Sequence, residues 1–334
     1  MAAEAPLLTH FGIPKEAISV KDALKTEKAK IQIVELTGSS FAITASAVIK
    51  ESSNPQLFIL RNKEDASYFT NDIEKLLNNE VFFYPASYRR AYQFEETDNA
   101  NILLRIEVLN KLIQKRNPII ITYPEALSEK VVSRKELKKN SVSLKVSDQI
   151  EIDILKEILL NLNFKKVEFV IEAGEFSVRG GIVDIYSFAD ELPFRLEFFD
   201  TTIESIRIFD INTQLSVNTT NKINIIPNTE AKKSINHQVS LLEYLPKNTV
   251  IWIKDITYTK GILNNYFDKA NEEHKKYLTN STTNHLLPDC LFTNGDEFLD
   301  QLKNFSVIEN NNKNFLKPTD VVNGNTTPIT TINK

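Results

Sequence analysis

The stretch EAGEFSVRGGIVDIYSFADELPFRLEFFDTTIESIRIFD, residues 172–210, decides the fold. The whole chain holds eight glycines, and Gly174, Gly180 and Gly181 all lie in this stretch. Glycine is used where the backbone needs a positive φ or passes close to another group. Closely spaced glycines in a glycine-poor chain therefore indicate turns, and the alternating runs between them predict several antiparallel strands.

The run 194–199, FRLEFF, shows the strand alternation most clearly. Successive side chains on a strand point to opposite faces, so Phe194, Leu196 and Phe198 share an apolar face that requires a core. Arg195, Glu197 and Phe199 share the other face.

That second face has two interpretations. An aromatic residue beside an arginine, on the polar side of a strand, has the composition of a binding hot spot, and Arg179 stands just before a turn that could bring it to the same surface. Alternatively, Phe199 closes the edge of a second small core, and Arg195 and Glu197 form a solvated ion pair. Single exposed apolar residues are common.

The runs GEFSVRGGIVDIYSF, ELPFRLEFFD, IESIRIFD and TQLS, between residues 174 and 216, carry a family resemblance. They resemble the signature of the N-terminal module of bacterial transcription-repair coupling factor (Mfd), and the repair subunit UvrB has a similar pattern. The resemblance extends over residues 36–227. It implies a degenerate helicase-like α/β lobe, similar to domain 1 of UvrB, with an inserted α+β domain that binds UvrA.

The resemblance also implies which residues contact the partner. The family's contact positions correspond to Arg179, Arg195 and Phe199. In this interpretation the arginines pair with acidic groups of UvrA, Phe199 is the apolar anchor, and Glu197 holds Arg195 in its rotamer. In the longer proteins the same surface contacts the protein's own C-terminal region, so in this chain it is expected to be open.

Composition excludes several classes of function. The length of 334 residues suggests two or three domains, and the net charge of −4 gives no bulk attraction to DNA or membrane. The single cysteine, Cys290, excludes an internal disulfide, and no metal site is expected around His274 or His285. No apolar run approaches the ~18 residues of a membrane span. A cytoplasmic protein without membrane contact is expected.

The segment 31–49 has the strand–turn–helix layout of a phosphate-binding loop. Its turn consists of Thr37, Gly38, Ser39 and Ser40, and it lacks the second glycine and the lysine that hold phosphates. Phe41 stands near the lysine position. We interpret the turn as a relic, and expect neither a cofactor nor catalysis in this chain. ATP and magnesium belong to the motor of the full-length family, whose members are ATP-dependent DNA translocases.

The rest of the chain completes the lobe. Strands expected at 57–60, 81–84, 118–122 and 250–253 alternate with helices at 41–49, 63–77, 97–115 and 258–278, which predicts a parallel sheet covered on both faces. A polar helix is expected at 20–30, and a strand at 223–226 that rejoins the parallel sheet. The segment 84–92, with three tyrosines and Arg89 and Arg90, could stack on bases, but a turn packed on the lobe is favoured.

Four domain segments follow from these assignments. The first part of the lobe is 1–123, the α+β UvrA-interaction domain is 124–211, the second part of the lobe is 212–308, and 309–334 is a linker or disordered tail. The predicted function is recruitment of UvrA to RNA polymerase stalled at DNA lesions, as part of nucleotide excision repair. In the full-length family, RNA polymerase and double-stranded DNA are further partners. The chain is expected to be a fragment without the motor.

Two alternatives remain open. The first is a UvrB-like, ATP-dependent protein that binds damaged DNA, which would need the missing loop lysine and an aromatic hairpin. The second is a self-standing degenerate domain that regulates UvrA by competing with UvrB for the same surface.

Overall fold

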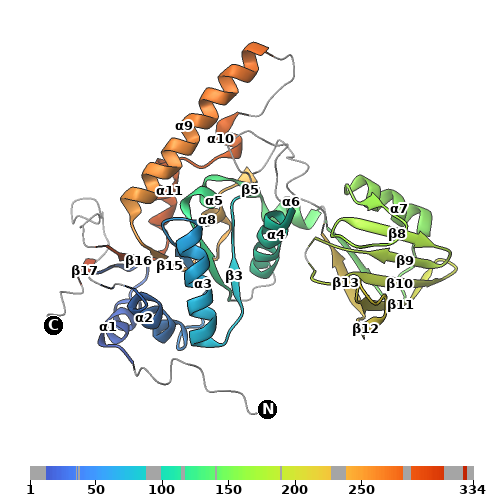
Figure 1. The fold of residues 1–334 in the computed structure, drawn as a ribbon, viewed down its shortest axis with the longest axis horizontal. Coiled ribbons are helices and arrows are strands. Elements are labelled where there is room, and N and C mark those ends of the chain that lie inside the picture. Colours follow the sequence, from blue (N-terminus) through green and yellow to red (C-terminus); the bar gives the residue numbers. More distant parts are fainter. Residues whose placement is uncertain are drawn as a thin grey trace. The chain divides into compact units, whose positions relative to one another are not determined.

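The computed structural model describes residues 13–34, 36, 38–87, 99–113, 117–139, 141–188, 190–226, 238–280, 287–311 and 326–328. The chain divides into two compact units (Figure 1). Unit 1 comprises residues 1–131 and 238–334, and unit 2 comprises residues 132–237. Unit 2 therefore interrupts unit 1 along the sequence.

A seven-stranded sheet forms the centre of unit 1, in the order β17-β1-β16-β15-β2-β4-β3, and every neighbouring pair is parallel. Its strands are β1 (Lys30–Ile33), β2 (Gln56–Ile59), β3 (Val81–Phe83), β4 (Ile119–Thr122), β15 (Val250–Ile253), β16 (Ser306–Asn310) and β17 (Thr326–Pro328). The inner strands β2, β4 and β15 are buried at every residue, as expected of parallel strands covered on both faces. The predicted parallel sheet is confirmed.

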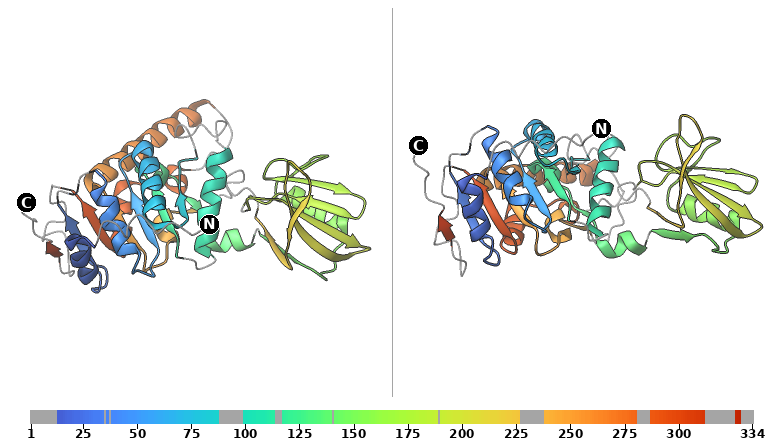
Figure 2. Two further views of the ribbon diagram at one scale, coloured as in Figure 1. Left: turned by 60° about the horizontal axis from the view of Figure 1, so that its bottom comes forward. Right: turned by 90° about the horizontal axis from the view of Figure 1, so that it is seen from below.

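The helices of unit 1 alternate with these strands (Figures 1 and 2). They are α1 (Lys15–Ala23), α2 (Ser40–Ile49), α3 (Lys63–Leu77), α4 (Asn99–Ile113), α5 (Pro124–Ser128), α8 (Leu241–Tyr244), α9 (Ile256–Asn280), α10 (Pro288–Leu291) and α11 (Gly295–Leu302). A short ladder joins β5 (Val131–Val132) and β14 (Gln238–Val239).

Aromatic side chains fill the core of unit 1 between α2, α3 and the sheet. The Phe58 ring stacks on Trp252 at 5.4 Å between centroids, and Phe41 lies edge-on to both rings. The indole N–H of Trp252 donates to the Gln56 side chain at 2.8 Å, so its only polar atom is satisfied in a fully buried site.

Unit 2 is built on a six-stranded sheet with the order β12-β11-β10-β9-β8-β7. All its neighbouring pairs are antiparallel except β7 and β8. The elements of the unit are α6 (Arg134–Lys139), β6 (Val142–Lys145), α7 (Ile152–Asn161), β7 (Lys165–Lys166), β8 (Glu175–Arg179), β9 (Ile182–Ile185), β10 (Phe194–Phe199), β11 (Thr202–Phe209), β12 (Ser216–Thr219) and β13 (Lys222–Ile225).

One face of the unit 2 sheet is covered by α7 and by the antiparallel pair β6–β13 (Figure 1). The core between them includes Leu155 and Leu159 from α7, and Phe194 and Leu196 from β10. Phe194, Leu196 and Phe198 thus face the core, as the alternation of residues 194–199 predicts. The other face of the sheet carries the polar residues of the same strands.

Gly174 shows why the glycines of this stretch are needed. Its φ is +88°, and a Cβ built on it would lie 2.3 Å from the ring of Phe188. Gly180 also has a positive φ, +59°, but nothing stands within 4 Å of its Cβ position. Gly174 is therefore required by both conformation and space, and Gly180 by conformation alone.

Two predicted elements were wrong. The N-terminal helix spans Lys15–Ala23 rather than 20–30, because Ala17 and Val20 supply its buried face, and Lys28, in the left-handed region at φ +54°, belongs to the turn before β1. The strand expected to rejoin the parallel sheet is β13, which pairs with β6 in unit 2. Its alternating burial suits a sheet with one solvent face, not a strand buried on both.

The compact units also place the boundaries differently from the sequence analysis. Residues 124–131 pack in unit 1, whereas β12 and β13, within 212–226, belong to unit 2 because they pair with β11 and β6. The expected tail begins later, since β16 runs to Asn310. Most of 309–334 lies outside the described residues, and Thr326–Pro328 forms β17 beside β1.

Candidate protein-interaction face

The polar face of the unit 2 sheet gathers charged residues from four neighbouring strands. Arg179 is on β8, Asp184 on β9, Arg195 and Glu197 on β10, and Arg207 on β11. We call these five residues the arginine face. The ladder register sets Asp184 directly opposite Arg195, and Arg195 opposite Arg207. Directly opposed side chains lie on the same face.

Asp184 is the centre of this face. Its side chain is 1% exposed, and both Arg179 and Arg195 form ion pairs with it. Arg195 donates from Nε to Oδ1 at 2.7 Å and from Nη2 to Oδ2 at 2.9 Å, while Arg179 donates from Nη2 to Oδ2. A bidentate arginine–carboxylate pair is both strong and geometrically specific. One buried carboxylate thus orders two arginines.

Arg195 is held on every side. Its Nη1 donates to the Gln214 carbonyl at 3.2 Å, its Nη2 to the Gln214 side chain at 3.3 Å, and its guanidinium lies 4.4 Å from the Phe209 ring centroid. The hydrogen bond to Asp184 raises the pKa of Arg195 above its ordinary value. The side chain is only 17% exposed. This arginine is therefore rigid and offers little of its polar edge to solvent.

Arg179 is less enclosed. Besides Asp184 it donates from Nη1 to the carbonyl of Glu168 at 3.2 Å, and it lies 5.0 Å from the Phe169 ring centroid. Both predicted arginines thus lie on one face, as expected, but the structure adds an internal partner, Asp184, that the sequence analysis did not identify.

The role given to Glu197 was wrong. It does not fix Arg195; its Oε2 accepts from Arg207 Nη2 at 2.9 Å and from the Ser205 hydroxyl at 2.7 Å. Asp184 is the carboxylate that fixes Arg195. The signal that could have found it was the register of β9 against β10, which sequence alternation alone does not supply.

Phe199 ends β10 and is 71% exposed. The ladder irregularity between Glu197 and Phe198 puts an extra residue in β11, so β10 keeps its alternation and Phe198 packs against the core. Phe199 then stands on the side of Arg195 and Glu197. Asp200, at φ +54°, makes the turn that follows. The exposed reading of Phe199 is confirmed, and the reading in which it closes a second core is not.

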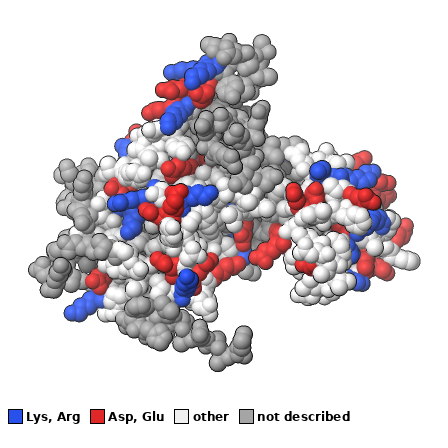
Figure 3. Space-filling model, viewed as in Figure 1, with Lys and Arg blue, Asp and Glu red and all other residues white. Residues whose placement is uncertain are grey.

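The charges of unit 2 are mixed in sign. In the view of Figure 3, lysines and arginines alternate with aspartates and glutamates over unit 2 instead of forming one basic field. Such a pattern favours pairing with particular groups of a partner over bulk attraction to a polyanion.

The relic turn of unit 1 has the geometry of a helix start without phosphate chemistry. Gly38 is in the left-handed region at φ +53°, and the side chain of Ser39, which precedes α2, accepts no capping hydrogen bond. Thr37 lies outside the described residues. Phe41 is buried in the aromatic core, and Lys50 ends α2 at its far terminus. No lysine therefore stands in this turn among the described residues.

The acidic residue after β15 has a structural role. Asp255 accepts from the backbone N–H of Tyr258 at 2.8 Å, near the start of α9. Glu309, fully buried on β16, accepts from the backbone N–H of Ile256 at 2.9 Å. Burial raises the pKa of Glu309 to about 7. Both carboxylates thus satisfy backbone donors where α9 begins.

A second buried network lies in unit 1. Arg105, which is fully buried, donates to the Pro85 carbonyl at 2.9 Å and lies 3.4 Å from Glu129 and 4.4 Å from the Tyr84 ring centroid. Glu129 also accepts from the backbone N–H of Ser87 at 2.9 Å. Tyr84 is thus a core residue; Arg89, Arg90 and the other tyrosines of segment 84–92 lie outside the described residues.

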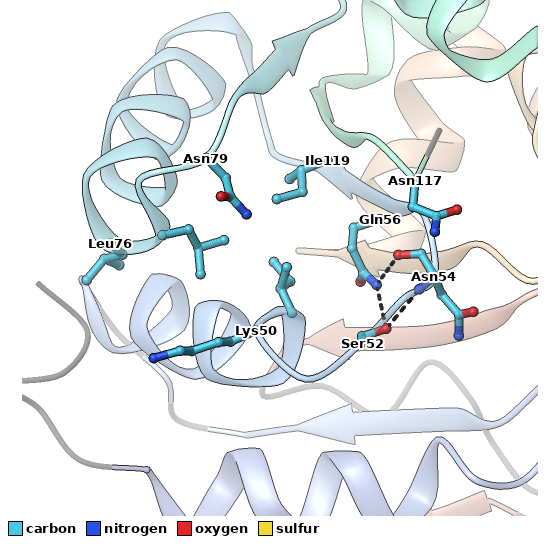
Figure 4. Close-up of a pocket in the computed structure, with 10 residues that line it drawn as sticks. Lys50, Ser52, Asn54, Gln56, Leu76, Asn79, Asn117 and Ile119 are labelled. Atoms are coloured by element: carbon cyan, nitrogen blue, oxygen red, sulfur yellow. Dashed lines mark hydrogen bonds between the residues drawn. The ribbon is translucent and has the colours of Figure 1, made fainter. Parts of the chain in front are cut away.

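A pocket of about 360 Å³ opens at the edge of the unit 1 sheet where β2 and β4 begin (Figure 4). Asn54, Asn79 and Asn117 line it, with Lys50 at its side. The Gln56 side chain donates to the Asn54 carbonyl at 2.9 Å. Ligands of parallel sheets bind at the opposite, carboxyl edge, and Lys50 is the only charged residue among the described residues that line this pocket. It carries no candidate activity.

No helix in the described part of the chain is long and apolar enough to cross a membrane.

Comparison with known proteins shows what the chain is similar to. Residues 142–230 match the family model of the UvrB interaction domain, a stretch that contains the whole arginine face. The chain is 32% identical over 193 residues to the transcription-repair-coupling factor of Bacillus subtilis (strain 168). It is 30% identical over 188 residues to that of Staphylococcus aureus (strain bovine RF122 / ET3-1) and 25% over 193 residues to that of Escherichia coli (strain K12).

These matches cover 56–58% of this chain but only 16–17% of the relatives, so the chain spans about one sixth of the length of the curated relatives it matches. The matches support the predicted resemblance to the N-terminal module of transcription-repair-coupling factors.

Proposed function

We propose that this chain recruits UvrA in transcription-coupled nucleotide excision repair, and that it does so through the arginine face and Phe199. The observation that carries the proposal is the position of Phe199. It is a large apolar side chain, 71% exposed, on the same side of the sheet as an ordered set of arginines, inside the matched UvrB interaction domain. An aromatic anchor surrounded by ordered polar groups is the usual anatomy of a hot spot.

The lobe formed by unit 1 is proposed to be a degenerate relative of a helicase domain. Its parallel sheet and the strand–turn–helix at Gly38 support this, while the absence of a lysine in the described part of that turn argues against phosphate binding. The contacts of the longer relatives with RNA polymerase and double-stranded DNA are part of the same proposal and are assigned to regions outside this module.

The test is a titration of UvrA against the wild-type chain and the variant Phe199→Ala. Truncation of a hot-spot aromatic costs ~2 kcal/mol or more, which is a ~30-fold weaker Kd. Tyr68→Ala is the matched control, because Tyr68 is 74% exposed on α3 of unit 1. Equal affinities for the wild type and a folded Phe199→Ala variant would refute the proposed surface.

Arg195→Ala is a second variant, but its Kd must be interpreted together with the stability of unit 2. Removing Arg195 leaves the buried Asp184 with Arg179 as its remaining ion-pair partner among the described residues. A weakened Kd is therefore informative only if circular dichroism and the unfolding midpoint show that unit 2 keeps its structure.

A further inference from the structure

The three arginines of the arginine face differ in how many donors they have left. A guanidinium carries five N–H donors. Arg195 makes four hydrogen bonds, to Asp184 and Gln214, and Arg179 makes two. Arg207 makes one, from Nη2 to Glu197. Among the described residues, Arg207 therefore retains the largest uncommitted share of its donor fork.

Exposure follows the same order. The side chain of Arg207 is 42% exposed, compared with 34% for Arg179 and 17% for Arg195. Arg207 is also held in place: Glu197, which accepts its single hydrogen bond, is itself fixed by the Ser205 hydroxyl at 2.7 Å. An accessible arginine whose orientation is already set loses little side-chain freedom when it binds a ligand.

The charge around Arg207 also favours an anionic ligand. Arg195 is its direct cross-strand partner, and the arginine face as a whole holds three arginines against two carboxylates. Asp184 is committed to Arg179 and Arg195, so within the described part of unit 2 Glu197 is the one carboxylate that forms an ion pair with Arg207. Carboxylates match the planar arginine fork in a bidentate way.

We infer that Arg207 is a partner-binding residue that donates hydrogen bonds to a carboxylate side chain of the protein partner. Asp184, Arg179 and Arg195 stabilise the structure of the face. This rests on the proposed function, with UvrA as the partner. The expected partner surface is an apolar recess for Phe199 beside an exposed aspartate or glutamate. Sequence reasoning passed over Arg207 because nothing in the run IESIRIF distinguishes it from an ordinary solvated strand residue.

The experiment titrates UvrA against the full chain with Arg207→Ala, Arg207→Lys, Phe199→Ala and Lys165→Ala. Lys165→Ala is the matched control: it removes one positive charge from unit 2 at β7, where the side chain is 78% exposed and 3.9 Å from Glu175. We expect Arg207→Ala to weaken binding ~tenfold or more. Arg207→Lys is expected to restore only part of the lost affinity, because lysine keeps the positive charge but lacks the planar, bidentate guanidinium group.

Two further readouts separate binding from structure. Because Arg207 and Glu197 are both substantially exposed, the urea midpoint of unit 2 should stay unchanged in Arg207→Ala. The dependence of Kd on salt should become shallower in this variant than in Lys165→Ala, since an interfacial ion pair is lost.

The outcomes are distinct. Wild-type affinity in Arg207→Ala, together with weak binding by Phe199→Ala, would overturn the role of Arg207 and leave the proposed function standing. An equal loss in Arg207→Ala and Lys165→Ala would also overturn it, because bulk charge would then explain the effect. No binding by the wild type, or wild-type affinity in every variant, would instead refute the proposed function itself.

Discussion

Replacement of Asp184 by asparagine tests the centre of the arginine face. Asparagine keeps the size of the side chain but removes its charge, and it turns an amide donor toward guanidinium groups that are donors themselves. Asp184 is 1% exposed and accepts hydrogen bonds from two arginines. The substitution therefore leaves two cations without their common carboxylate.

The magnitude follows from burial. Removal of one partner of a fully buried ion pair costs ~3–5 kcal/mol, and a hydrogen bond to a charged group contributes ~1.5–3 kcal/mol. Arg179 and Arg195 are 34% and 17% exposed, so both can regain some hydration. We therefore expect a loss of ~2–4 kcal/mol in the free energy of unfolding of unit 2. With a urea slope of ~2 kcal/mol/M, the middle of the usual range, the midpoint should fall by ~1–2 M.

The assay is urea unfolding followed with two signals. The single tryptophan, Trp252, is buried in β15 of unit 1, so its fluorescence reports that unit, whereas far-ultraviolet circular dichroism reports both. We expect the fluorescence transition to stay in place while an earlier dichroism transition appears. Glu197→Gln is the control, since its partly exposed pair with Arg207 contributes at most ~1 kcal/mol. A shift no larger than that of the control would refute the central position of Asp184.

Four further results are expected. Gly174→Ala should destabilise the protein by ~1–3 kcal/mol, and by more than Gly180→Ala. Both glycines have a positive φ, but only at Gly174 would the added Cβ also collide with the Phe188 ring. Equal melting temperatures of the two variants would contradict this. Burial raises the pKa of Glu309 to about 7, above its usual 4.5, so the folded state binds the proton more tightly and stability should fall as pH rises from about 4.5 to about 7. Glu309→Gln should flatten that slope in melting curves followed by tryptophan fluorescence, and an unchanged slope would exclude Glu309 as its origin. Arg105→Leu removes the arginine that forms an ion pair with the buried Glu129. It should lower the free energy of unfolding of unit 1, measured in urea, by ~3–5 kcal/mol. A loss below ~1 kcal/mol would show that the network is dispensable. ATP with magnesium should leave the melting temperature unchanged, and a clear rise would restore the nucleotide-dependent alternative.

Local patterns predicted what depends on local physics. The alternation of 194–199 separates core from surface because a strand has a period of two, and α3 was predicted with its actual ends, Lys63 and Leu77. The start of α3 is set by a local N-cap, because the Asn62 side chain accepts a hydrogen bond from the backbone N–H of Asp65 at 2.8 Å.

Pairing between distant strands was the part that local patterns could not supply. The strand at β13 was recognised, but its partner was not, because the choice between β6 and the parallel sheet depends on which core has room for two isoleucines. Asp184 was overlooked for the same reason. Its two arginine partners come from the strands on either side of it, and only the register of β8, β9 and β10 brings them together.

The interruption of unit 1 by unit 2 has a consequence for synthesis of the chain. Lys30 pairs with Val307, and β15 is the strand that joins β16 to β2. At ~5–20 residues per second, a ribosome needs on the order of ten to forty seconds to pass from β1 to β15. During this interval β2 has an unpaired edge, and the strands that flank β1 do not yet exist. Unit 2, which is continuous in sequence, can fold in the meantime. Nascent chains should therefore expose unpaired, aggregation-prone strand edges of unit 1 until about residue 310 has been synthesised, and should depend on chaperones during that time.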